Sequence, residues 1–380
     1  MDTDALIAHA RARFDHVAAR RVLKEKYEAK LLFAYNGGMF RTTPELLAFV
    51  QSWPIDELFL KDLYDNPIEV DKQVFLVKLQ QHYHEQMNAW HNEHAELQKK
   101  TMTTGALIFA FNNEQTDYVE MAAWSSKRIR KFLNIPVAVV TDCVEHDRTR
   151  VFDRVINVAP QTGGTRYFED YQATVSWHNA GRVDAYSLTP WGQTLVLDAD
   201  YVVCSSDLTR VLDSPPDFMC HRHALDLSTG QFMTALNQFG QHGLPMWWAT
   251  VMMFRKSNTA QYIFDCMEMI RNNWQHYRDL YGIQKPTYRN DFALSIALGI
   301  VSGHTGVVDE IPWPLASITP GTTLLRNSSD DYMIEYVDPS KNKKYMTFTG
   351  LDFHAMGKKD LGDIVEADRR ARLLDSSTEH

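Results

Sequence analysis

The sequence has few of the features that mark secreted or membrane-embedded proteins. It contains only 4 cysteines in 380 residues, and their scatter, without a CxxC pair, is typical of small buried side chains in a reducing compartment. The longest apolar stretch near the middle, Met246–Phe254, is far too short to span a bilayer. The N-terminus lacks the basic start, apolar segment and cleavage site of a signal peptide. We therefore expect a cytoplasmic protein.

The chain also has fewer basic than acidic residues. The chain has 39 Lys+Arg against 48 Asp+Glu, a net charge of -9, which argues against a surface that grips nucleic acid or anionic lipid throughout. Hydrophobic residues at 44% and charged residues at 23% are ordinary for a globular protein and exclude wholesale disorder. A chain of 380 residues exceeds what one core usually absorbs, so we expect two domains or one domain with a large appendage.

Residues 1–100 show helical patterns and no strong alternation, which predicts an all-helical N-terminal domain. The first helix is expected from Ala5 to Tyr35, ended by Asn36-Gly37-Gly38, because glycine adopts the left-handed conformation that closes a helix. A second helix is expected near Thr43-Pro44-Glu45, where threonine caps and proline fits the first turn. A third is expected from Asp71 to Lys100.

From Gly105 onward, short apolar runs alternate with helical patterns, which is typical of a mostly parallel sheet buried on both faces. We predict an α/β core over residues 101–325 and a C-terminal segment, 326–380, that closes the active site and ends in a helical tail. The expected strands are Ala106–Phe111, Pro136–Asp142, Arg154–Val158, Thr194–Leu197, Tyr201–Val203 and Ala249–Phe254. The expected helices are Asp117–Leu133, Arg182–Ser187, Thr259–His276 and Asn290–Ile300.

Leu195–Asp200 carries an apolar strand directly into two acids separated by one residue. In an extended chain, residues i and i+2 point to the same side, about 6–7 Å apart, so Asp198 and Asp200 repel each other unless a cation lies beside them. Open α/β sheets bind ligands at the carboxyl ends of their strands. Carboxylate ligands suit Mg²⁺ or Mn²⁺, which keep open positions for phosphate oxygens. A solvated turn with a helix cap is the alternative.

Short motifs stand in a characteristic order around this acid pair: Phe111-Asn112-Asn113, Tyr118, Asp142, Arg182, Asp184, Ala249–Phe254 and His354–Lys358. This order, over roughly residues 104 to 358, resembles the nucleotide-sugar-dependent glycosyltransferases of the GT-A fold, particularly the retaining galactosyltransferase and glycogenin-like group. The resemblance implies a Rossmann-like GT-A sheet and transfer of a sugar from a nucleotide-sugar donor, expected to be a UDP-sugar. Asp198 and Asp200 would form its DxD motif.

The resemblance also implies roles for individual residues. Asp198, Asp200 and His354 would hold Mn²⁺ or Mg²⁺, and Lys358 would contact the donor diphosphate. The chain departs from the family pattern where Thr250 replaces a glycine and where Asp360-Leu361 replace the Pro-Trp after the lysine. The remaining donor contacts implied by the resemblance are Phe111, Asn112, Asn113, Tyr118, Asp142, Arg182 and Asp184.

Asn290 and Asp291 begin an apolar helix, a position that Asn and Asp favour in any protein. GT-A enzymes place an acid or amide at such a helix start, near the reacting sugar carbon or the acceptor hydroxyl, which makes both residues candidate catalytic residues. Asp291 would be the general base of an inverting enzyme, or would stabilise the cationic sugar in a retaining one. Gly163–Arg166 is a further candidate contact loop, or simply a turn.

Several alternatives stay open at the level of sequence. The acceptor is a glycan, a protein or a hydroxymethylated base in DNA; the negative net charge disfavours DNA, whereas the basic helix end Lys127–Lys131 keeps it open. A nucleotidyltransferase also uses an Asp pair and a metal, but normally carries a basic, glycine-rich loop that Phe111–Glu114 lacks. The third alternative is a non-catalytic binding or scaffold protein whose N-terminal helices mediate protein contacts.

Overall fold

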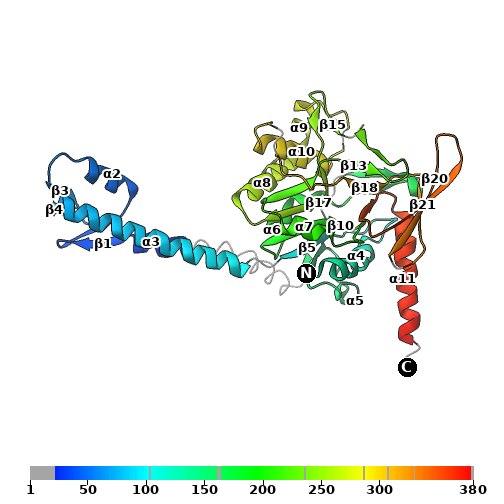
Figure 1. Ribbon diagram of the computed structural model, residues 1–380, viewed down its shortest axis with the longest axis horizontal. Helices are drawn as coiled ribbons and strands as arrows, with labels where there is room; N and C mark the ends of the chain where they lie inside the picture. Colours follow the sequence, from blue (N-terminus) through cyan, green and yellow to red (C-terminus); the bar gives the residue numbers. More distant parts are fainter. Residues whose placement is uncertain are drawn as a thin grey trace. The chain divides into compact units, whose positions relative to one another are not determined.

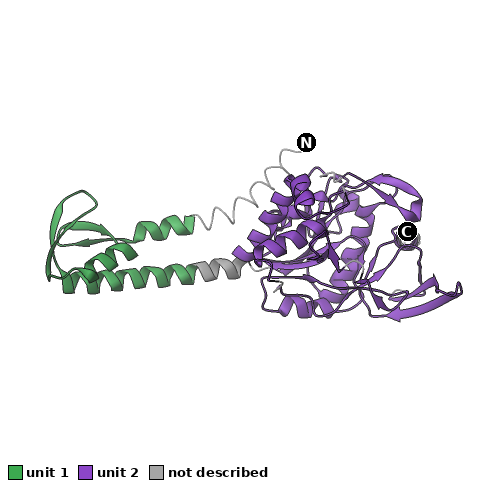
Figure 2. Cartoon of the chain, turned by 90° about the horizontal axis from the view of Figure 1, so that it is seen from above, with its two compact units in different colours: residues 1–102 green, residues 103–380 purple. Residues whose placement is uncertain are grey.

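The structure is a computed structural model of the chain (Figure 1). It describes residues 22–101, 104–160, 164–234, 237–285, 287–305, 308–328 and 330–377. The chain forms two compact units, Met1–Met102 and Thr103–His380 (Figure 2). No helix among the described residues is both long and apolar enough to cross a membrane.

The N-terminal unit contains two β-hairpins as well as helices. The prediction of an all-helical domain is therefore wrong. Of the helix expected over 5–35, residues 5–21 lie outside the described residues, 22–30 are helical, and the chain is a strand from Leu32. The elements that follow are β1 (Leu32–Tyr35), β2 (Gly38–Arg41), α2 (Pro44–Ser52), β3 (Glu57–Lys61), β4 (Pro67–Asp71) and α3 (Lys72–Thr101).

The hairpins explain why the helical prediction failed. Asn36 and Gly37 have positive φ values of 46° and 80°, the conformation of a two-residue hairpin turn, so the glycines join two strands instead of ending a helix. In Glu57–Lys61 only Leu58 and Leu60 are buried, an alternation too short to dominate the sequence pattern. The core of this unit consists of Phe40, Val50, Leu58, Leu60, Val70, Phe75 and Leu79.

The larger unit is built on a six-stranded sheet of order β12-β17-β10-β5-β6-β7. The ladders β10–β5, β5–β6 and β6–β7 are parallel, whereas β17 pairs antiparallel with β10 and β12. The predicted mixed, mostly parallel α/β sheet is confirmed. Its strands are β5 (Thr104–Phe109), β6 (Val137–Thr141), β7 (Arg154–Asn157), β10 (Gln193–Asp198), β12 (Phe218–His221) and β17 (Trp248–Arg255).

Helices cover both faces of this sheet (Figure 1). Successive strand residues point to opposite faces, so Ala106 and Ile108 pack in one apolar layer with α4, α7 and α11, while Leu107 and Phe109 pack in another with α8 and α10. This double burial is why the strands read as continuous apolar runs. The helices are α4 (Tyr118–Leu133), α5 (His146–Thr149), η1 (Glu169–Tyr171), η2 (Ala180–Asp184), α6 (Ala185–Leu188), α7 (Asp207–Asp213), α8 (Asn258–Asn272), α9 (Trp274–Leu280), α10 (Asn290–Val301) and α11 (Lys359–Ser377).

A five-stranded sheet of order β11-β22-β18-β13-β14 and a three-stranded sheet of order β19-β20-β21 complete the larger unit, with two small hairpins, β8–β9 and β15–β16. The expected helical tail is part of the longer α11. The strands are β8 (Thr165–Phe168), β9 (Ala173–Ser176), β11 (Tyr201–Val202), β13 (Ala224–Asp226), β14 (Gln231–Phe232), β15 (Gln238–Phe239), β16 (Leu244–Pro245), β18 (Leu315–Ile318), β19 (Thr323–Arg326), β20 (Asp331–Val337), β21 (Lys343–Thr349) and β22 (Phe353–Ala355).

Gly105 lets the indole of Trp191 lie against β5, where its Nε1 donates to the Ala106 carbonyl at 3.1 Å. A Cβ at residue 105 would overlap this indole. We expect Gly105→Ala to lower the free energy of unfolding by about 1–3 kcal/mol, because the packed ring must shift. The matched control is Gly362→Ala in α11, where the nearest atom lies 3.5 Å away and alanine adds about 0.5–1 kcal/mol of helix propensity. Urea unfolding that gives both variants the same stability would contradict this packing.

His221 at the end of β12 is fully buried, and neither ring nitrogen has a hydrogen-bond partner among the described residues. Burial lowers the pKa of His221 to about 3, below an unfolded value of about 6.5. Its contribution to stability is therefore complete above about pH 6.5 and declines by about 1.4 kcal/mol per pH unit below it, because the unfolded chain binds the proton first.

We expect His221→Phe to remove this dependence. Between about pH 7.5 and about pH 5, the variant should lose about 2 kcal/mol less unfolding free energy than the wild type, since a phenyl ring binds no proton. Urea unfolding at both pH values measures the difference. Identical slopes in the two proteins would show that His221 is protonated, or hydrogen-bonded, in the folded state.

Candidate functional site

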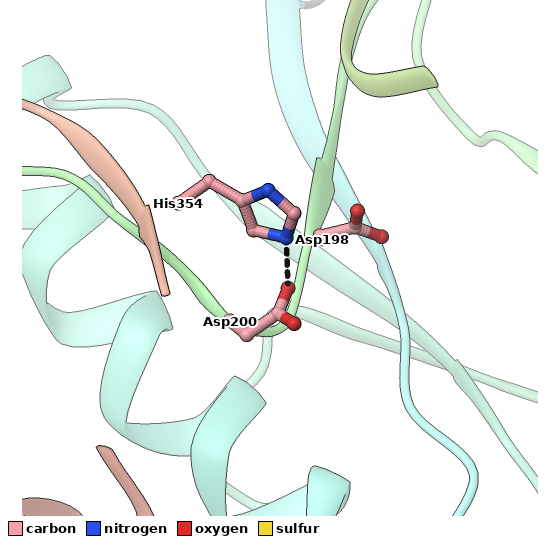
Figure 3. Close-up of side chains that lie close together, drawn as sticks. All are labelled: Asp198, Asp200 and His354. Atoms are coloured by element: carbon pink, nitrogen blue, oxygen red, sulfur yellow. Dashed lines mark ion pairs between the residues drawn. The ribbon is translucent and has the colours of Figure 1, made fainter. Parts of the chain in front are cut away.

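Two acids and a histidine from distant parts of the chain meet at the end of β10 (Figure 3). Asp198 is the last residue of β10, and Asp200 lies in the turn before β11. His354 belongs to β22, which pairs antiparallel with β11 so that His354 lies opposite Tyr201. The ligand atoms of Asp198, Asp200 and His354 all lie within 4.8 Å of one another, and His354 Nε2 is 3.5 Å from Asp200 Oδ1.

Each acid also contacts a cation. The Arg182 guanidinium, from η2, pairs with Asp198, and the Lys358 ammonium pairs with Asp200. Lys358 Nζ donates a second hydrogen bond to the Ala355 carbonyl at 3.0 Å. The two neighbouring carboxylates are therefore compensated by two positive charges, which offsets their mutual repulsion.

These charges persist at neutral pH although the groups are buried. Burial alone raises the pKa of Asp200, but the charges of Lys358 and His354 outweigh it and hold that pKa well below its usual range. Burial lowers the pKa of Arg182 to about 10, with Asp291 and Asp200 acting in the opposite direction. Asp200 and Arg182 are therefore ionised at pH 7, and removal of the partner of either one leaves a charge buried and unpaired.

The donor set fits a divalent cation. Asp198 and Asp200 offer the carboxylate oxygens that Mg²⁺ and Mn²⁺ prefer, and an imidazole suits a transition metal. His354 is 8% exposed, and its Nδ1 is buried without a hydrogen-bond partner among the described residues. A bound cation would share Asp198 and Asp200 with Arg182 and Lys358.

The three candidate metal ligands line a cleft of about 290 Å³. Side chains predicted from the sequence come to it from many parts of the larger unit, and the C-terminal segment contributes His354, Met356 and Lys358. The predicted site residues that line the cleft are Phe111, Asn113, Tyr118, Arg182, Asp198, Asp200, Asn290, Asp291, His354 and Lys358.

Asn290 and Asp291, at the first turn of α10, face the same cleft. Asp291 accepts hydrogen bonds from the Ala249 backbone N–H at 3.0 Å and from the Arg289 guanidinium at 2.7 Å. Burial raises the pKa of Asp291, but Arg289 and the Ala249 N–H outweigh it, so the net shift is downward. Asn290 Nδ2 donates to the Asn179 carbonyl at 2.9 Å. Both side chains are thus held in fixed orientations, and Asp291 is ionised.

Three predicted donor contacts are not among the residues that line the cleft. The Asn112 Oδ1 accepts the backbone N–H of Val119 at 3.0 Å, at the start of α4. Asp184 forms an ion pair with Arg271 at 3.2 Å, and Asp142 is exposed after β6. From the sequence alone, a residue that caps a helix, forms an ion pair or faces solvent could not be distinguished from one that binds a ligand.

The cleft also contains residues that sequence reasoning missed. Trp177 and Arg289 line it, as does Asp170, whose Oδ2 accepts the backbone N–H of Lys358 at 2.6 Å. Arg166, from the candidate contact loop, lines it as well, whereas Gly163 lies outside the described residues. Of Trp177, Arg289 and Asp170, only Arg289 could have been suspected from the sequence, because it directly precedes the candidate residues Asn290 and Asp291.

No family model and no curated protein matches this sequence. The solved structures that match include the glycosyltransferase GlyE of Streptococcus pneumoniae TIGR4, with 11% identity, a TM-score of 0.33, and coverage of 55% of this chain and 45% of that chain. The galactosyltransferase LgtC, in complex with donor and acceptor sugar analogues, matches with 14% identity, a TM-score of 0.35, and coverage of 54% and 72%. Mouse xyloside xylosyltransferase 1 matches with 13% identity, a TM-score of 0.33, and coverage of 53% and 83%.

Glycosyltransferases are thus among the matching structures. The match spans less than half of the GlyE chain, 45%. Since these likenesses are remote, we derive the function from the side chains of the cleft and not from the neighbours.

Lys358 is expected to compete with a divalent cation, because its ammonium contacts the Asp200 carboxylate. We expect Lys358→Met to bind Mn²⁺ about ten-fold more tightly than the wild type without nucleotide, since a repelling charge is removed from the site. Isothermal titration calorimetry measures both affinities. Lys359→Met is the matched control, because Lys359 is the next residue, is exposed and does not line the cleft. Unchanged Mn²⁺ affinity in Lys358→Met would contradict the competition.

Proposed function

We propose that this protein is a metal-dependent glycosyltransferase, which moves a sugar from a nucleotide-sugar donor, expected to be a UDP-sugar, to an acceptor hydroxyl. The observation that carries the proposal is the convergence of Asp198, Asp200 and His354 within 4.8 Å in a cleft at the carboxyl end of a buried α/β strand. Open α/β sheets bind ligands at this edge, and a carboxylate–imidazole set is suited to a cation that holds a diphosphate.

The groups around Asp198 and Asp200 would supply positive charge where the nucleoside diphosphate leaves. A divalent cation held by Asp198, Asp200 and His354 would neutralise the negative charge that develops on the departing nucleoside diphosphate. Lys358 and Arg182, which contact the two acids and are both buried, add positive charge. Pre-oriented charges of this kind stabilise a transition state without reorganising during the reaction.

Asp291 and Asn290 supply the opposite, acceptor-facing side of the proposed reaction. Because Arg289 and the Ala249 N–H lower the pKa of Asp291, its carboxylate is a weak base at neutral pH, and stabilising positive charge on the transferred sugar suits it better than removing a proton. This favours the retaining over the inverting alternative. Asn290 would orient the acceptor hydroxyl. The acceptor itself is a glycan, a protein or a modified DNA base.

A panel of nucleotide sugars tests this function. With Mn²⁺ present, we expect slow hydrolysis of one donor, detected as release of its nucleoside diphosphate. Asp200→Ala should lower that rate by about a hundred-fold or more, because it removes a metal ligand and leaves Lys358 unpaired. Asp213→Ala at the exposed end of α7 is the matched control, and it should keep the wild-type rate.

Two results would contradict the proposal. The first is a panel in which no nucleotide sugar binds or turns over with Mn²⁺ or Mg²⁺. The second is release of pyrophosphate from a nucleoside triphosphate and a sugar phosphate, which would identify a nucleotidyltransferase. Circular dichroism of Asp200→Ala separates lost catalysis from lost folding.

A further inference from the structure

Four basic side chains line the cleft, Arg166, Arg182, Arg289 and Lys358. Three of its basic side chains have an acidic partner, since Arg182 pairs with Asp198, Arg289 with Asp291 and Lys358 with Asp200. Arg166 also lines the cleft, but no carboxylate of the described residues forms an ion pair with it. One guanidinium of the cleft therefore has no ion-paired counter-ion among the described residues, although the charge of Asp291 acts on it.

Arg166 is held in place without that counter-ion. Its guanidinium lies 3.8 Å from the ring centroid of Trp177, a stacked cation–π contact that fixes the plane of the group. One terminal nitrogen donates to the Tyr288 carbonyl at 3.4 Å. A guanidinium has five N–H donors, so this geometry leaves donors for a ligand in the cleft.

The stacking and hydrogen-bond contacts of Arg166 are with residues other than the three candidate metal ligands. Its contacts are with Trp177 and Tyr288, next to the segment Arg289–Asp291. Burial lowers the pKa of Arg166 to about 10; the charge of Arg289 acts in the same direction and that of Asp291 in the opposite one, so Arg166 remains charged at pH 7 beside another cation. A ligand that carries negative charge would relieve both the desolvation and the repulsion.

We propose that Arg166, stacked on Trp177, binds an oxyanion, a carboxylate or phosphate carried by the transferred sugar or by the acceptor. This rests on the proposed function, because it assigns the diphosphate to Asp198, Asp200, His354 and Lys358 and leaves the Arg166 side for the reacting sugars. The substrate class is then anionic sugars. The competing explanation is that Arg166 only braces β8 against the start of α10.

The first arm of the test compares two donors with Mn²⁺ present, UDP-glucuronic acid and UDP-glucose, by isothermal titration calorimetry. The second arm compares glucuronic acid and glucose 6-phosphate with glucose, with and without UDP. We expect the anionic member of one arm to bind about 10- to 100-fold more tightly than the neutral one. The arm that shows the preference identifies the source of the oxyanion.

Substitutions of Arg166 test whether this residue causes the preference for anionic ligands. Arg166→Met should abolish it, and Arg166→Lys should keep part of it, because lysine retains the charge but not the planar fork. The control is Arg154→Met on β7, an exposed arginine outside the cleft, which should keep the full preference. UDP alone should bind Arg166→Met as tightly as it binds the wild type.

Three outcomes would overturn the inference. Equal binding of anionic and neutral ligands by the wild type in both arms would exclude an oxyanion site. An equal loss of affinity for UDP and UDP-glucuronic acid in Arg166→Met would place Arg166 at the diphosphate. If Arg166→Met melts at a lower temperature but keeps the preference for anionic ligands, Arg166 only braces β8 against the start of α10. If no nucleotide binds, the proposed function fails, while the free sugars still test Arg166.

Discussion

The site depends on the compensation of two acids that a single strand end forces together. Asp198 and Asp200 are close neighbours in the chain; Arg182 pairs with Asp198, and the charges of Lys358 and His354 keep the buried Asp200 ionised. Two of these three partners come from the C-terminal segment. The site therefore exists only when that segment is docked, and the same charges that stabilise the acids are available to a bound diphosphate.

The sheet holds this arrangement rigidly. Because both faces of the six-stranded sheet are covered by apolar layers and helices, the end of β10 cannot move without disturbing two cores. The antiparallel pairing of β11 with β22 then carries His354 to Asp200. Arg166 and Trp177 approach from the β8–β9 hairpin, and Asp291 from the start of α10. Rigid elements thus supply the charged groups from three directions.

Sequence patterns predicted the elements whose burial is strong and continuous. The runs in β5, β6, β10 and β17 have apolar side chains on both faces, so their position was clear to within a few residues. The hairpins of the N-terminal unit and the strands β19–β21 were missed, because they are short or partly exposed and lack the continuous apolar runs of the buried strands. Asn36-Gly37 was assigned to a helix end although the same dipeptide forms a hairpin turn, since both structures use a positive φ.

By itself, the sequence determined the α/β class and the strand that leads into Asp198 and Asp200, because strand burial and short-range spacing are local properties of the chain. The candidate role of His354 was implied by the resemblance to a family and not by any local pattern. Only the tertiary structure decided which side chains share the cleft. It brought in Arg166, Trp177 and Arg289, and it left Asp142 in solvent. The reason is physical: ion pairing, stacking and burial depend on distances between residues far apart in the chain, which folding alone sets.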